Sequence, residues 1–370
     1  MKKSYDISIK GFLDRGVKKG VYPGAVLLIA KGSRIIFFRE VGYLSLIPEQ
    51  FPMRKDSIFD LASLTKPLAT TLALMKLVDE DKVNLDQPLS GIITTSPLLD
   101  KKDLTLRLIM SHSAGFVDWQ PYYLDLMKYR PDERKKLLRE RIVKEPLAYR
   151  PGKNCIYSDL GFMILEWIVE EVSGMPLHYY TKQNFYRSLS LERTFLNAKT
   201  LPAGLKKGEI AATEDCPWRN RIIQGEVHDE NAYVVGGYSG HAGLFSNAQE
   251  VYIIAKMLKE HYHEERDDYF KSATVKAFFK RQGVVNGCSW ALGWDTPSDR
   301  DSSSGRYLSP NSVGHLGFAG TSIWMDLDRD IMIIFLTNRV HPSRNNQKIK
   351  QFRPALHDLI IVEICEGQVN

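Results

Sequence analysis

One short stretch of the chain, residues 59–67 with the sequence FDLASLTKP, decides most about its fold and chemistry. Pro67 is favoured in the first turn of a helix, because its missing N–H group would have no partner there anyway. If a helix begins here, Ser63 and Lys66 stand three positions apart on one face. The helix N-terminus then adds backbone N–H groups and the positive end of its dipole. The stretch therefore predicts a hydroxyl and an amine held side by side at a helix start.

This pair of residue types points to acyl transfer by a serine. Such chemistry needs a hydroxyl nucleophile, a group that takes its proton, and hydrogen-bond donors for the developing oxyanion. Ser63 and Lys66 would supply the first two. The S-x-x-K spacing alone is weak evidence, since Ser and Lys are common enough to produce it about once or twice by chance in such a chain. Its weight depends on the other motifs and on their order.

Two further motifs follow along the chain. Tyr157-Ser158-Asp159 comes after the helix-breaking Pro151-Gly152, and His315-Leu316-Gly317 begins a predicted strand that runs to Asp326. With these motifs in this order, the chain resembles the serine β-lactamase and penicillin-binding-protein family, whose pattern is S-x-x-K, Y-x-N and [KH]-x-G. Class C enzymes, D-alanyl carboxypeptidases and esterases on this fold are the most similar members. The resemblance covers nearly the whole chain, with further landmarks at residues 108–116, 227–232, 240–246 and 336–339.

The resemblance implies a role for each motif residue. Ser63 attacks the substrate carbonyl, and Lys66 and Tyr157 share its proton. The backbone N–H groups of Ser63 and Phe318 bind the oxyanion, and Gly317 lies beside the substrate. A lysine or tyrosine acting as a base near pH 7 needs a pKa about 3 below its usual value of roughly 10. The sequence leaves open which of the two is the base.

Asp159 departs from the family pattern, which has Asn at this position. An ionised carboxylate only accepts hydrogen bonds, so a carbonyl on the acyl side of the substrate loses a donor. If Asp159 pairs with Lys66, the lysine stays charged and the base role moves toward Tyr157. The negative charge of Asp159 near the phenol of Tyr157 opposes this move of the base role. The sequence leaves open which of the two effects is larger.

His315 and Leu316 are the second departure, because members that process β-lactams usually carry Lys followed by Thr or Ser. Histidine has a pKa of about 6.5 and is mostly neutral at pH 7. Losing a charged hydrogen bond to a substrate carboxylate costs about 1.5–3 kcal/mol, or roughly one to two decades in affinity. We therefore expect a carboxylesterase-like hydrolase of small esters. The alternatives are a β-lactamase or a D-alanyl-D-alanine carboxypeptidase or D-amino peptidase, and a non-catalytic binding or scaffold protein, for which Asp159 is the only hint.

Apolar periodicity predicts an α/β (α+β) fold, in which helices flank an antiparallel sheet and an all-helical domain is inserted. Residues 1–60 and 225–370 would form the α/β domain and residues 61–224 the mainly helical one, with the active site between them. The predicted helices are 7–18, several between 67 and 223, and 347–364. The predicted strands are 25–30, 34–41, 242–246, 290–294, 315–326 and 331–337.

Composition excludes several classes of protein. The 50 basic and 44 acidic residues are spread along the 370-residue chain, so we expect no nucleic-acid partner. No window approaches the roughly 18 apolar residues of a membrane helix. Asp6, Lys10 and Asp14 interrupt an N-terminal apolar region, so we expect a mature, soluble, cytoplasmic protein. The oligomeric state stays open.

Four cysteines are widely spaced without a C-x-x-C pair: Cys155, Cys216, Cys288 and Cys365. This spacing predicts free thiols and disfavours a disulfide or zinc framework. Cys155 lies two residues before Tyr157, and we expect an inert buried thiol there, with modulation of the site by oxidation as the alternative.

Other chemically suggestive residues carry less weight. Ser113 approaches the G-x-S-x-G nucleophile elbow but lacks its first glycine. The stretch from His263 to Asp267 is one residue short of a zinc H-E-x-x-H motif. We expect no metal and no cofactor. Trp119 and Tyr122 are candidates for lining an acyl pocket, with core packing as the equal alternative. His228, Asp229 and His241 could ligate a metal, but as family landmarks they are expected to serve loops and turns beside the active site.

Overall fold

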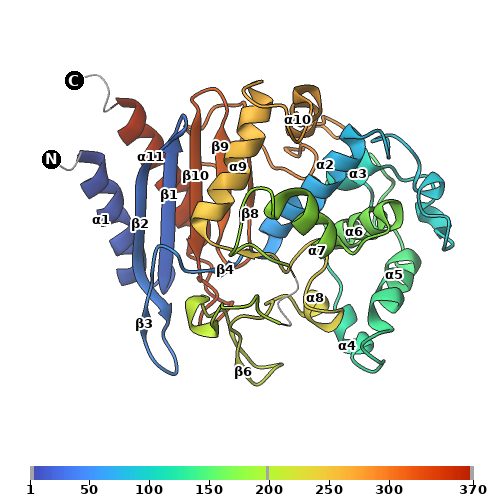
Figure 1. Ribbon diagram of the computed structural model, residues 1–370, viewed down its shortest axis with the longest axis horizontal. Coiled ribbons are helices and arrows are strands. Elements are labelled where there is room, and N and C mark those ends of the chain that lie inside the picture. Colours follow the sequence, from blue (N-terminus) through green and yellow to red (C-terminus); the bar gives the residue numbers. More distant parts are fainter. Residues whose placement is uncertain (1–3, 197–199, 367–370) are drawn as a thin grey trace.

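The computed structural model describes residues 4–196 and 200–366, and its centre is a six-stranded antiparallel sheet (Figure 1). The strand order is β3-β2-β1-β10-β9-β8, so both ends of the chain contribute strands. The bounds are β1 Gly24–Lys31, β2 Arg34–Ser45, β3 Phe51–Pro52, β8 Ser312–Leu316, β9 Ser322–Asp326 and β10 Ile331–Thr337. Two short ladders pair β4 Phe59–Asp60 with β7 Phe245–Ser246, and β5 Asp215–Cys216 with β6 Arg221–Ile222.

Helices cover both faces of the sheet. On one face lie α1 and α11, and on the other lies α9, beyond which the remaining helices α2 to α8 and α10 lie (Figure 1). The helices are α1 Ser4–Lys18, α2 Leu72–Asp79, α3 Leu106–Met110, α4 Tyr122–Leu126, α5 Arg134–Lys144, α6 Asp159–Ser173, α7 Leu177–Thr181, α8 Glu230–Val234, α9 Ala248–Tyr262, α10 Ser272–Phe279 and α11 Ile349–Glu366.

The central strands β1 and β10 are continuous apolar runs because both of their faces are buried. Leu27 pairs with Phe335, and both side chains belong to the core under α1 and α11. The next pair, Leu28 and Ile334, points to the other core, which extends toward the remaining helices. Alternate residues of a strand face opposite sides of the sheet, so one apolar run fills two cores.

The predicted fold class is confirmed, and so are the first helix, the first hairpin, the strand at residues 331–337 and the closing helix. The division into two domains at residues 60 and 225 stays a prediction. Three strand predictions are wrong in detail. Residues 315–326 form the end of β8, a turn and β9, because the chain reverses at Gly320, where φ is +96°. Residues 290–294 form a turn with Gly293 at φ +73°, and only Phe245–Ser246 of the stretch 242–246 is a strand.

The cysteine prediction is also wrong, because Cys155 and Cys288 form a disulfide. They are 133 positions apart in sequence, yet their Cα atoms lie 6.0 Å apart. Spacing along the chain carries no information about such a tertiary contact. Cys216 and Cys365 are free, as predicted.

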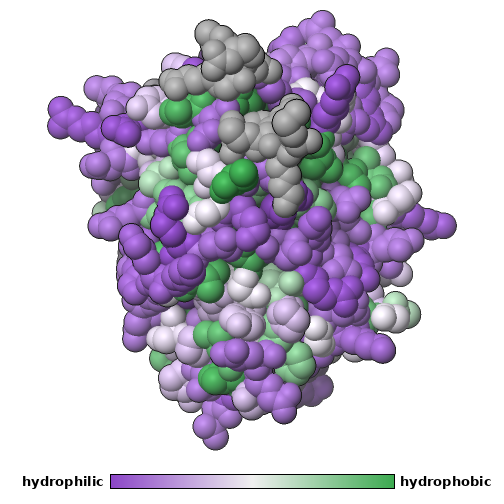
Figure 2. All heavy atoms as spheres, turned by 90° about the vertical axis from the view of Figure 1, so that its left-hand side faces the viewer, coloured by the Kyte–Doolittle hydropathy of each residue, from purple (hydrophilic) through white to green (hydrophobic). Residues whose placement is uncertain are grey.

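The surface agrees with the expected absence of a membrane-spanning segment. Within residues 4–196 and 200–366, no helix is long and apolar enough to cross a membrane. Figure 2 views the molecule from the side of α1 and α11, where hydrophilic residues cover most of the face and leave only small apolar areas between them.

Candidate active site

The nucleophile motif follows β4 directly and leads into α2. Ser63 lies in a 3₁₀ turn, Ala62–Leu64, and a π-helical turn from Lys66 to Thr71 joins that turn to α2. The buried carboxylate of Asp60 accepts hydrogen bonds from the backbone N–H groups of Ala62, at 2.8 Å, and His228, at 2.7 Å. Ala62 has a φ of +49°, a conformation that non-glycine residues rarely adopt and that is concentrated at functional sites. Asp60 therefore holds the residue before Ser63 in an unusual conformation.

Lys66 contacts the three other polar side chains of the candidate site. Its buried ammonium nitrogen lies 3.1 Å from the hydroxyl of Ser63, 2.5 Å from the hydroxyl of Tyr157 and 2.6 Å from the carboxylate of Asp159. A lysine ammonium has three N–H donors, so these three oxygens satisfy it completely. The structure thus brings Ser63, Lys66, Tyr157 and Asp159 together from segments about 90 residues apart.

The start of α6 positions Tyr157 and Asp159. Ser158 between them is the N-cap residue, whose hydroxyl accepts from Gly161 N–H and donates to the carbonyl of Val117 at 2.6 Å. The N–H of Ser158 donates to Nδ1 of His112 at 3.0 Å. An N-cap fixes the backbone on both of its sides, so the phenol and the carboxylate are held in one orientation.

The charges of these groups are coupled. Burial alone would lower the pKa of Lys66, but the neighbouring Asp159 carboxylate and Tyr157 hydroxyl outweigh it and raise that pKa above its usual value. Burial raises the pKa of Tyr157; the Lys66 ammonium lowers it in part, and Asp159 raises it again. The resting site therefore holds Lys66 as an ammonium and Tyr157 as a neutral phenol.

The turn between β8 and β9 lies directly against the nucleophile segment. A Cβ atom on Gly317 would lie 2.5 Å from the carbonyl oxygen of Leu61 and 2.0 Å from the hydroxyl of Thr321, so only glycine fits this approach. The Thr321 hydroxyl also donates to Leu61 at 3.0 Å. The carbonyl of Phe318 accepts from Nε of Arg339 at 2.8 Å, and Phe318 and Ser63 line the same cavity.

His315 lies behind the site and is not a cation. Its ring is 1% exposed, and Nδ1 lies 2.8 Å from the carbonyl oxygen of Leu316. The ring centroid is 6.0 Å from that of Tyr157 and 5.4 Å from that of Trp290. Burial, assisted by the charge of Lys66, lowers the pKa of His315 to about 3. His315 is therefore a neutral packing partner of Tyr157.

A cavity of about 390 Å³ opens in front of these groups. Of the predicted substrate-contacting residues, Asp159, Trp119 and Phe318 line it, whereas His315 and Gly317 are not among its lining residues. Trp119 and Phe318 are 40% and 46% exposed. Tyr122 does not line it, because its hydroxyl turns away to Glu145 at 3.0 Å. The lining residues are Ala62, Ser63, Asp118, Trp119, Tyr157, Asp159, His228, Asp229, Glu230, His241, Ala242, Phe318 and Arg344.

Arg344 is a cavity residue that the sequence did not single out. Its guanidinium donates to Glu214 at 2.7 Å and to Glu230 at 2.6 Å. Against the effect of burial, hydrogen bonds from His228 and Arg344 lower the pKa of Glu214 to about 2, so this network stays charged at neutral pH. The partners lie 114 and 130 residues before Arg344, and no local motif signals them.

Asp229 and His241 serve the loops beside the site, as expected. Asp229 caps α8 by accepting from Ala232 N–H at 2.7 Å, and its carboxylate lies 2.9 Å from Nε2 of His241. Ligand atoms of Asp159, Asp229 and His241 lie within 4.8 Å of one another, a set that could hold a cation. The Lys66 ammonium already supplies a positive charge 2.6 Å from Asp159.

Comparisons with known proteins find relatives along nearly the whole chain. N-acetylmuramyl-L-alanine amidase of Bacillus subtilis (strain 168) is 33% identical over 96% of this chain and 87% of its own length. A putative D-alanyl-D-alanine carboxypeptidase of Escherichia coli (strain K12) is 32% identical over 94% of this chain and 86% of its own length.

Solved structures show the same fold at lower identity. EstCE1, a hydrolase with promiscuous acyltransferase activity, superposes with a TM-score of 0.71 at 21% identity, covering 95% of this chain and 98% of that one. Simvastatin synthase LovD from Aspergillus terreus has a TM-score of 0.73 at 16% identity, covering 98% and 100%. The family model described as Beta-lactamase matches residues 9–355, and the chain therefore belongs to the beta-lactamase family.

Proposed function

We propose that this beta-lactamase-family hydrolase works through an acyl-enzyme formed on Ser63. The observation that carries the proposal is the contact of one buried ammonium, that of Lys66, with the hydroxyls of Ser63 and Tyr157 and the carboxylate of Asp159. A serine hydroxyl is a weak nucleophile until a neighbouring group takes its proton. The site supplies such a group in contact with the same ammonium.

Tyr157 is the base in this proposal. Asp159 keeps Lys66 protonated, so the lysine has no lone pair to offer. Burial raises the pKa of Tyr157 overall, so the phenol must first lose its proton to solvent, and the Lys66 ammonium favours this loss. The phenolate takes the Ser63 proton as the hydroxyl attacks the carbonyl, and the resulting phenol returns it to the leaving group. The N–H groups of Ser63 and Phe318 would bind the oxyanion. Water then attacks the acyl-enzyme, and Tyr157 takes the proton of the water and returns it to Ser63.

The preferred acyl donors are neutral esters and amides. A substrate carboxylate needs a cation, and neither His315 nor Arg344 is free to serve as one. His315 is buried and neutral, and Arg344 is already bound by Glu214 and Glu230. Binding a carboxylate at Arg344 would have to displace one of these charged hydrogen bonds, each of which is worth about 1.5–3 kcal/mol.

A comparison of substrates tests this preference. We expect a short-chain nitrophenyl ester to exceed nitrocefin in kcat/KM by at least about tenfold, because nitrocefin carries a carboxylate that finds no unpaired cation among the described residues that line the cavity. Steady-state hydrolysis followed by absorbance measures both, with the Ser63→Ala variant subtracted as the background. Turnover of nitrocefin that is orders of magnitude faster than that of the ester contradicts the assignment.

A second candidate is the hydrolysis of a cell-wall peptide bond, which the names of the relatives favour. The C-terminal amide of N-acetylmuramyl-L-alanine, which carries no carboxylate, and a peptide ending in D-Ala-D-Ala belong in the same substrate panel. The D-Ala-D-Ala peptide ends in a carboxylate and should be the poorer of the two for the reason given above. Chromatography of the released products measures the turnover of each substrate. If the D-Ala-D-Ala peptide is turned over faster than both the ester and the muramyl amide, the function is that of a carboxypeptidase.

The Asp159→Asn variant should shift the pH dependence. Asp159 raises the pKa of both Lys66 and Tyr157, so its loss lowers both. A base with a raised pKa stays protonated until higher pH, and activity therefore rises with pH toward that pKa. In the variant we expect this rise in kcat/KM to move to lower pH.

The nearly isosteric control Asp118→Asn changes an exposed carboxylate at the cavity and should leave the pH profile of kcat/KM unchanged. An unmoved Asp159→Asn profile would remove Asp159 from the proton path.

A further inference from the structure

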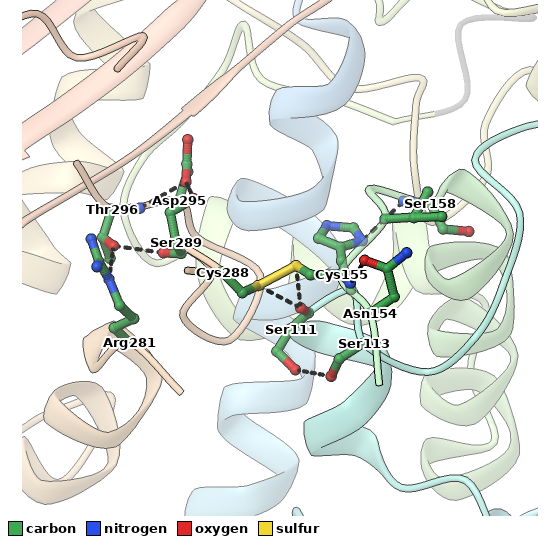
Figure 3. The surroundings of a disulfide bond; sticks show 12 residues. Ser111, Ser113, Asn154, Cys155, Ser158, Arg281, Cys288, Ser289, Asp295 and Thr296 are labelled. Atoms are coloured by element: carbon green, nitrogen blue, oxygen red, sulfur yellow. Dashed lines mark hydrogen bonds between the residues drawn. A yellow bond between two sulfur atoms is a disulfide. The ribbon is translucent and has the colours of Figure 1, made fainter. Parts of the chain in front are cut away.

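The disulfide Cys155–Cys288 links two segments that meet at the active site. Cys155 lies in the segment before α6, and Cys288 lies between α10 and β8 (Figure 3). Both sulfur atoms lie 3.8 Å from the carbonyl oxygen of Ser111, in the loop after α3. Three separate parts of the chain therefore converge on this bond.

The Cys155 segment carries the proposed base. Tyr157 follows two residues later, and the residue between them, Ile156, donates its backbone N–H to the carbonyl of His112 at 3.0 Å. The hydroxyl of Tyr149 donates to the same carbonyl at 3.1 Å. Hydrogen bonds thus attach this segment to His112, and the disulfide attaches it to Cys288.

The Cys288 segment carries Trp290, which packs against the same catalytic ring. Its ring centroid is 5.5 Å from that of Tyr157 and 4.4 Å from that of His112. Further along, Asp295 exchanges two backbone hydrogen bonds of 2.7 and 2.9 Å with Gly314 in β8. The segment is therefore attached to the edge strand beside the site, and the disulfide ties that edge to the Tyr157 segment.

We propose that Cys155–Cys288 is a thiol-exchange site for a small dithiol reductant. Reduction of the bond loosens the segment that carries Tyr157 and thereby lowers kcat. The effect on kcat rests on the function proposed for Ser63 and Tyr157. A thiolate of the reductant attacks one sulfur and releases the other cysteine as a thiol. The second thiol of the reductant then closes its own disulfide and frees the first cysteine. Two electrons and two protons pass to Cys155 and Cys288, and the dithiol is oxidised.

Accessibility and reversibility support this assignment. Cys155 and Cys288 are both partly exposed, whereas the free Cys216 is buried. A reductant can therefore reach the bond, as thiol exchange requires. After reduction both thiols can donate to the carbonyl of Ser111, which keeps them close enough to re-form the bond.

The test compares the oxidised chain with the same chain reduced by dithiothreitol and freed of reagent without air. Thiol titration in denaturant should count two thiols before reduction and four after. We expect kcat for a nitrophenyl ester to fall about tenfold or more on reduction, because small displacements of a catalytic group cost that much. Activity should return when oxidised glutathione restores the bond. Four thiols before reduction, or equal kcat in both states, would overturn the proposal.

Variants separate this effect from general damage. The double variant with Cys155→Ser and Cys288→Ser should have the kcat of the reduced chain, and dithiothreitol should not change that kcat. The thermal unfolding midpoint of the variant is recorded to show that it folds. Cys216→Ser and Cys365→Ser are the matched controls and should keep the full response. Hydrogen exchange provides a readout independent of the substrate, and amides of residues 154–158 should exchange faster after reduction. An oxidised chain inactive on every acyl donor would refute the proposed function, whereas unchanged exchange would refute the redox site.

Discussion

Replacing Ser63 by Ala should lower kcat by about six decades, as the loss of a serine nucleophile does in other serine hydrolases. The reason is that, in the part of the chain that the structure describes, Ser63 is the only serine or threonine that lines the cavity, and its hydroxyl lies 3.1 Å from the Lys66 ammonium. The measurement is steady-state turnover of a nitrophenyl ester, together with intact-protein mass after incubation with a fluorophosphonate. The native chain should gain one adduct on Ser63 and the variant none.

Ser113 provides the matched control for this experiment. It is the other serine with a nucleophile-like sequence, but its side chain is fully buried, with its hydroxyl 2.8 Å from that of Ser111. Ser113→Ala should therefore keep both turnover and labelling. A loss below tenfold in Ser63→Ala would move the nucleophile elsewhere, and a native chain unlabelled by several acylating probes would favour the binding or scaffold alternative.

Replacing Tyr157 by Phe should lower kcat by about three decades, within the range that a positioned general base contributes. The change removes only the hydroxyl that lies 2.5 Å from Lys66 and leaves the ring to pack against His112 and Trp290. Turnover of the same ester, measured with the thermal unfolding midpoint, separates lost chemistry from lost stability. The effect should fall on kcat more than on KM, because the proton transfer occurs in the transition state.

Tyr122→Phe is the control for this variant. Its hydroxyl donates to Glu145 and lies outside the cavity, so removal should change kcat less than about twofold. If Tyr157→Phe keeps more than about a tenth of the activity, the phenol is not the base, and Lys66 takes that role despite its pairing with Asp159.

Local patterns in the sequence were enough to predict the fold class, which is confirmed, and to single out the candidate reacting groups, whose roles stay a prediction. The spacing of Ser63 and Lys66 places them together in any helical turn, because neighbours three positions apart share a face. The apolar run 331–337 could only be a buried strand or helix segment, and its length and β-branched residues favoured the strand. Tyr157 and Asp159 entered through their motif and their order along the chain.

The tertiary structure decided what depends on burial and on contacts between distant segments. His315 is neutral because the fold buries it behind Tyr157, and Lys66 is charged because the fold brings Asp159 to 2.6 Å. The Cys155–Cys288 bond and the partners of Arg344 escaped prediction for the same reason. Local periodicity constrains residues a few positions apart, whereas these pKa values, ion pairs and the disulfide depend on contacts between residues about 90 or more positions apart.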